Sequence, residues 1–186
     1  MARIFRRYKS TIYGNYRKAY LIDGALTGVV MSLLMLIRDL LADTPMSSPE
    51  NYVTEVVLAV GIFWASYQYR KQLPEGKVTL KELMMLGLGI GVVSGVVYGL
   101  WTWLRCGVID TTLVEHYNQQ RISMMKGAEE GADAKLAIEQ VKHYGAGDWA
   151  FISGFRTVVM SVIVTFFSAL VFWTEKAPVY QREKDN

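Results

Sequence analysis

Four long apolar blocks constrain this chain more than any other feature of its sequence. They lie at 20–41, 52–69, 83–104 and 149–173. Each block has close to the roughly 20 residues that a helix needs to cross about 30 Å of hydrocarbon. A soluble bundle is the alternative, but four such blocks leave little polar helix surface to face water. The pattern therefore predicts an all-α integral membrane protein, built as a four-helix bundle.

Lysine and arginine predict how this bundle is oriented. Basic residues crowd into 1–19, into the connection between the second and third blocks, and into 174–186. The first connection, 42–51, has no basic residue. The segment 105–148 has five basic residues, which seven acidic residues outnumber. Cytoplasmic segments carry the excess of lysine and arginine. We therefore expect both termini in the cytoplasm (N-in/C-in), with 105–148 as the outer loop and 174–186 as a cytoplasmic tail.

The segments outside the blocks have helical patterns of their own. Ile4, Tyr8, Ile12 and Tyr16 recur every fourth residue among basic residues, which is typical of a short helix lying on the inner leaflet, or of a basic tail. Within 105–148, apolar residues recur at helical spacing on both sides of a glycine break. We expect two amphipathic helices there. They would rest on the bilayer, cover the mouth of the bundle or bind another protein.

Small residues predict close helix packing. The third block carries glycine at every fourth position, at Gly87, Gly91, Gly95 and Gly99. Glycines at this spacing flatten one helix face, so that another backbone can approach closely. The first block offers a matching face at Gly24 and Gly28, and the fourth block offers Ser161, Thr165 and Ala169. The helix that meets the glycine face lies either in this chain or in another one.

Charged residues inside the apolar blocks form the main candidate site. Arg156 lies seven residues past Trp149, and thus about 10 Å into the bilayer. Glu55, Arg38 and Asp39 are expected at the same end, and Arg156 could pair with Glu55 or Asp39. This network is either a pin between helices or the lining of a polar cavity that admits an anion or a lipid phosphate. Asp23 is its counterpart near the inner interface.

The residues that catalysis would need are sparse. The single cysteine, Cys106, excludes an internal disulfide and a paired-thiol redox centre. His116 and His143 lie near acidic residues, but their spacing matches no zinc motif, and we expect them to be solvated. No catalytic or nucleotide-binding fingerprint occurs. A net charge of +3 gives no argument for nucleic acid. We therefore expect no catalytic residues, no metal and no cofactor.

Several runs of residues resemble a known family. They are the glycine-rich third block, the run from Val108 to Arg121, the Met124–Met125 pair, the run from Gln140 to Tyr144 and the fourth block. Over residues 14–175 the chain resembles the small inner-membrane proteins, common in Bacteroidota, filed as domain of unknown function number 4199. Asp110-Thr111 stands where that family often has an asparagine–proline pair. The resemblance implies a four-span protein of a bacterial inner (cytoplasmic) membrane with a large outer loop. It brings no assigned activity and no catalytic residues.

These observations favour one function over two others. We expect a non-enzymatic accessory or scaffold subunit, with membrane lipid, a membrane-protein partner or further copies of the chain as its partners. The alternative is a small transporter or lipid-handling protein with a polar site around Arg156. The third possibility, a membrane enzyme, is supported only by the presence of His116 and His143.

Overall fold

The computed structural model describes residues 16–41, 52–73, 78–128 and 132–174. The expected interfacial helix before residue 16, the first connection and the tail after residue 174 lie outside the described residues. Within these ranges every regular element is a helix, which confirms the all-α class.

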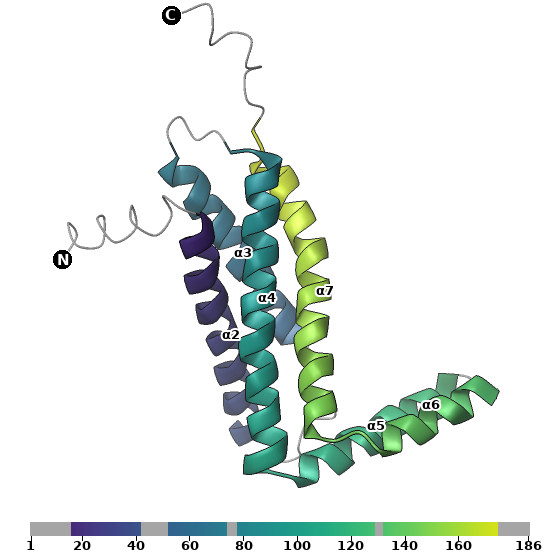
Figure 1. Cartoon of the computed structure of the whole chain (residues 1–186). Coiled ribbons are helices and arrows are strands. Elements are labelled where there is room, and N and C mark those ends of the chain that lie inside the picture. The colour runs from purple at the N-terminus through teal and green to yellow at the C-terminus, as the bar shows by residue number, and fades with distance from the viewer. Residues whose placement is uncertain (1–15, 42–51, 74–77, 129–131, 175–186) are drawn as a thin grey trace, which may run out of the picture.

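Four long helices lie side by side (Figure 1). They are α2 (Tyr16–Leu41), α3 (Tyr52–Gln72), α4 (Leu80–Leu104) and α7 (Ala146–Phe172). Helix α4 contacts each of the other three, and most closely α7 and α2. Two shorter helices, α5 (Thr112–Ala128) and α6 (Ala132–Lys142), pack on each other and leave one end of this group sideways (Figure 1). The connection between α4 and α7 is therefore helical, as the sequence predicts. It projects to one side of the long helices.

Three of the long helices are long and apolar enough to cross a membrane. The segments are Arg17–Leu40 in α2, Leu80–Ile109 in α4 with its extension, and Ala146–Phe172 in α7. Large apolar side chains cover their outer surface, and the buried side chains include many serines and threonines beside large apolar residues. That arrangement suits a protein surrounded by lipid. Helix α3 is not among the three, although its 21 residues span about 31 Å.

Helix α4 begins at a capping box and ends in a π turn. Thr79 caps the helix: its hydroxyl accepts from the Glu82 N–H at 3.3 Å, and the Glu82 carboxylate accepts from the Thr79 N–H at 2.9 Å. At the other end the helix widens into a π-helix, η2 (Arg105–Ile109), closed by the Asp110 N–H on the Arg105 carbonyl at 2.9 Å. Single π turns often occur at functional positions.

Candidate functional site

The four glycines of α4 lie against α7. Ser161 and Thr165 occupy the space beside Gly91 and Gly87, so their hydroxyl side chains fill the contact there. At Gly95 an added Cβ atom would lie 2.8 Å from the Gly154 carbonyl oxygen. The backbones of α4 and α7 are therefore in direct contact at Gly95 and Gly154, with no side chain between them. Of the two possibilities left open by the sequence, the structure places a helix of the same chain on this face.

The two glycines of α2 do not match those of α4. An added Cβ at Gly24 would lie 2.7 Å from the Val93 Cβ, and one at Gly28 would lie 2.7 Å from the Val97 Cβ. Val93 and Val97 belong to a different side of α4 from the glycine face. Helix α4 thus packs on α2 with valines against glycines, and on α7 with glycines against small residues.

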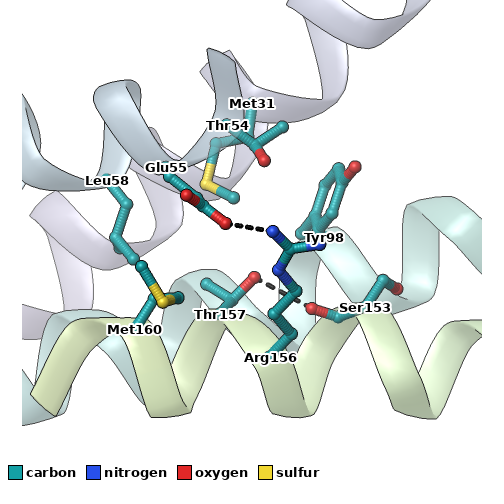
Figure 2. Close-up of a pocket in the computed structure, with 9 residues that line it drawn as sticks. All are labelled: Met31, Thr54, Glu55, Leu58, Tyr98, Ser153, Arg156, Thr157 and Met160. Carbon is teal, nitrogen blue, oxygen red and sulfur yellow. Dashed lines mark hydrogen bonds and ion pairs between the residues drawn. The ribbon is translucent and has the colours of Figure 1, made fainter. Parts of the chain in front are cut away.

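Arg156 pairs with Glu55 across the group of long helices. Figure 2 shows the guanidinium of α7 reaching the carboxylate of α3, with the Tyr98 ring of α4 beside it. The two side chains keep 33% and 21% of their surface exposed. The remaining space among the surrounding side chains is about 10 Å³, close to what one water molecule needs. The two charges therefore satisfy each other, with little room for a ligand between them.

Asp39 takes a different partner from the one the sequence suggested. Its carboxylate lies 2.8 Å from the Arg105 guanidinium, and the Arg105 side chain is only 8% exposed. The guanidinium lies over the Tyr117 ring, 5.9 Å from its centroid. Burial raises the pKa of Tyr117, and the nearby Arg105 charge opposes part of that effect. A second ion pair thus closes the helix group at its α5 end.

The sequence analysis missed Arg105 because the residue follows the last tryptophans of its span. An arginine in that position usually extends out of the bilayer. Here Arg105 begins the π turn and is buried, and no pattern in the sequence marks that turn.

The remaining predicted charges are Arg38 and Asp23. Arg38 is half-buried near the second pair, and its Nη1 atom has no hydrogen-bond partner among the described residues. Asp23 lies 16 residues before Asp39 on α2, about 24 Å along the helix axis. The predicted network is therefore two separate ion pairs at one end of the helices, and a distant Asp23.

A small buried cluster ties the α5–α6 pair, hereafter the arm, to the long helices. Cys106, Leu113, Tyr117 and Trp149 are each at most 4% exposed. The Trp149 indole N–H donates to the Asn118 side-chain oxygen at 2.8 Å, and the Asn118 amide donates to the Tyr144 carbonyl at 3.0 Å. The Tyr117 and Trp149 rings meet edge to face at 5.4 Å. The base of the arm is therefore fixed, while its far end, with Met124 and Leu136, is exposed.

The histidines belong to the arm. His116 lies against the Tyr117 ring, 6.3 Å between centroids, and His143 follows the end of α6. Among the described residues no three potential metal ligands of the histidine, cysteine and carboxylate types gather.

Comparison with known proteins gives a family and no activity. A family model described as "Protein of unknown function (DUF4199)" matches residues 23–174. Neither the curated proteins nor the solved structures contain a match.

Proposed function

This chain belongs to the DUF4199 family of proteins of unknown function, as its resemblance implied, and we propose that it is a non-enzymatic accessory or scaffold subunit of a membrane assembly. The arm carries the proposal. It is locked to the long helices at its base, and it holds exposed apolar side chains away from them. A rigid mount with a projecting apolar surface is suited to holding a second protein in a defined position.

The interior of the long helices supports a structural role for them. Arg105 and Arg156 are each paired with a carboxylate of another helix, so each of these two charges meets its opposite. Buried hydroxyls on α7 mostly bond within their own helix, as Thr157 does with the Ser153 carbonyl at 2.9 Å. This pattern is typical of packing between membrane helices.

We place the protein in a bacterial inner membrane as a four-span bundle with both termini in the cytoplasm. The basic residues of the two terminal segments and of the α3–α4 connection support that orientation. Crossing by α3 is supported by its outward apolar residues, Val56, Val60 and Trp64, and by the pairing of Glu55 inside. The arm would then lie at the outer surface.

The scaffold function is tested by native mass spectrometry on protein extracted gently from its own membrane at native expression. We expect a heavier complex containing a second polypeptide. Leu136→Gln removes an exposed apolar side chain from the arm and should release that polypeptide. Lys135→Gln is the matched control, because it places glutamine at the neighbouring exposed position without removing an apolar side chain. This variant should keep the second polypeptide. A chain that carries no second polypeptide, or a complex that survives Leu136→Gln and Met124→Gln together, contradicts the proposal.

A small transporter or lipid-handling protein remains the alternative, with Arg156 and Glu55 lining its site. It requires the 10 Å³ space beside the ion pair to open in another conformation. The double variant Glu55→Leu/Arg156→Leu separates the two functions, because it removes both charges while keeping the apolar volume. Unchanged assembly and growth would leave the pair as a pin. Lost growth with intact fold and assembly would favour transport.

A further inference from the structure

A groove of about 670 Å³ runs along the outer surface between α4 and α7. Side chains of α4 form one wall, and side chains of α7 form the other. The α4 wall consists of Val92, Val96, Leu100 and Trp103, and the α7 wall of Phe151, Phe155 and Val158. The rings of Phe151 and Phe155 stack nearly parallel on each other, with centroids 5.7 Å apart, so two adjacent aromatic side chains form this part of the α7 wall.

The floor of the groove is nearly bare backbone. Gly95, Gly99 and Gly154 lie at its bottom, together with Ala150. An added Cβ at Gly154 would lie 2.8 Å from the Gly95 carbonyl, and one at Gly99 would lie 3.0 Å from the Ala150 carbonyl. The same glycines that let the two helices touch therefore leave the surface above them hollow.

The length of the groove indicates what it fits. From Val92 to Trp103 the helix rises about 16 Å, close to half of the roughly 30 Å hydrocarbon layer. Trp103 lies at the end of the apolar block, where an indole N–H can meet the headgroup region. Towards the middle of the membrane the groove ends, since Ser161 and Thr165 fill the contact beside Gly91 and Gly87. The groove thus spans one leaflet.

We propose that this groove binds one hydrocarbon chain of a membrane lipid, in the leaflet at the Trp103 end of the helices. This binding goes beyond the scaffold function and does not depend on it. Apart from the Trp103 indole, the side chains of the groove are wholly apolar, which matches an alkyl chain. The groove's rise of about 16 Å along α4 is enough for a chain that reaches the middle of the bilayer. Dispersion contacts with the aromatic and aliphatic walls and with the bare floor would hold the chain longer than bulk lipid does.

A transmembrane helix, from a second copy or a partner, is the rival occupant. Such a helix crosses both leaflets in about 30 Å. It would leave this groove halfway and continue over the filled inner half of the α4–α7 contact. The one-leaflet length therefore favours a lipid chain.

Native mass spectrometry of the full chain with added palmitoyl-oleoyl phosphatidylglycerol or phosphatidylcholine tests the proposal. Phe155→Ala removes part of the wall, and Phe167→Ala is its matched control, because both side chains are 57% exposed on α7 and only Phe155 lines the groove. Gly147→Phe fills the groove end at a position where an added Cβ meets nothing within 4 Å. Size-exclusion chromatography shows whether each variant stays folded. If Gly147→Phe does not fold, the comparison of Phe155→Ala with Phe167→Ala tests the proposal by itself.

We expect the wild type and Phe167→Ala to retain one lipid of either headgroup when other lipids have been stripped. In Phe155→Ala and Gly147→Phe the retained fraction should fall about tenfold, which corresponds to about 1.4 kcal/mol. Equal retention by all four proteins, retention set by the headgroup alone, or no retained lipid in the wild type would overturn the proposal. So would a dimer that Gly147→Phe separates, because a second copy would then be the occupant. Loss of a partner polypeptide in Leu136→Gln tests the scaffold alone, so the two proposals fail independently.

Discussion

Removing one member of the Arg156–Glu55 pair should destabilise the protein far more than removing both. The pair joins α7 to α3, and its side chains are 33% and 21% exposed. Loss of one partner from a buried pair costs about 3–5 kcal/mol of unfolding free energy. Because this pair is partly exposed, we expect each single leucine variant to cost about 3 kcal/mol. The double leucine variant leaves no unpaired charge, so we expect it to cost about 1 kcal/mol or less. The double-mutant cycle should then show about 5 kcal/mol of non-additivity.

The two single variants should also differ from each other. Arg156→Leu leaves a carboxylate, which can take up a proton and become neutral. Glu55→Leu leaves a guanidinium, which cannot give one up. Glu55→Leu should therefore be the less stable of the two.

Equilibrium unfolding in mixed micelles, with sodium dodecyl sulfate as the denaturant, measures all four members of the cycle. Glu139→Gln, which breaks the exposed Glu139–Lys142 pair on α6, is the control and should leave the unfolding transition unchanged. Additive effects in the cycle, or a Glu55→Leu variant as stable as the wild type, would refute the view that Arg156 and Glu55 neutralise each other inside the helix group.

Three further predictions follow from single positions. Gly95→Ala should cost about 1–3 kcal/mol in the same unfolding assay, because the added Cβ would lie 2.8 Å from the Gly154 carbonyl; Gly147→Ala, which meets nothing within 4 Å, should cost nothing, and equal effects would contradict the packing. Cys106 is 1% exposed and should react with maleimide only after denaturation; rapid labelling of the folded protein would contradict its burial. Burial raises the pKa of Tyr117 above its usual value of about 10, so the unfolded chain loses this proton first, and stability should hold below about pH 10 and fall as the pH rises beyond it. Tyr117→Phe should weaken that fall, and an unchanged slope would show that another group causes it.

The sequence predicts the elements of this protein better than their contacts. The capping box at Thr79 and Glu82 uses residues three apart, so the local sequence contains all of it. The glycines at every fourth position of α4 likewise predict a flat face. Which helix covers that face depends on residues far away, and α2 and α7 both offer small residues. Only the structure distinguishes them, with α7 on the glycines and α2 on Val93 and Val97.

The charged residues show the same limit. Position along the span brings Arg156 and Glu55 to one depth, which is why the sequence suggests them as partners. Asp39 lies at a similar depth, and depth alone cannot assign it to Arg156 or to another base. In the structure Arg105 lies buried in the π turn and pairs with Asp39, and no sequence pattern marks that turn.

Helix α3 is the fourth span that we propose, although its composition alone does not place it among the helices apolar enough to cross a membrane. Mean hydropathy counts every residue of a segment, regardless of the side it faces. In α3 the polar residues Ser66 and Gln68 face inward and are buried, and Ser66 accepts a hydrogen bond from Ser168 at 2.9 Å. Glu55 is neutralised by Arg156. Lipid would therefore meet mainly the outward valines and aromatic rings of α3, and its polar residues would add little to the cost of crossing. If α3 crosses, cysteines placed at its two ends, in a chain lacking Cys106, should be labelled by impermeant reagents from opposite sides of the membrane; labelling of both from one side would leave α3 as a helix that does not span.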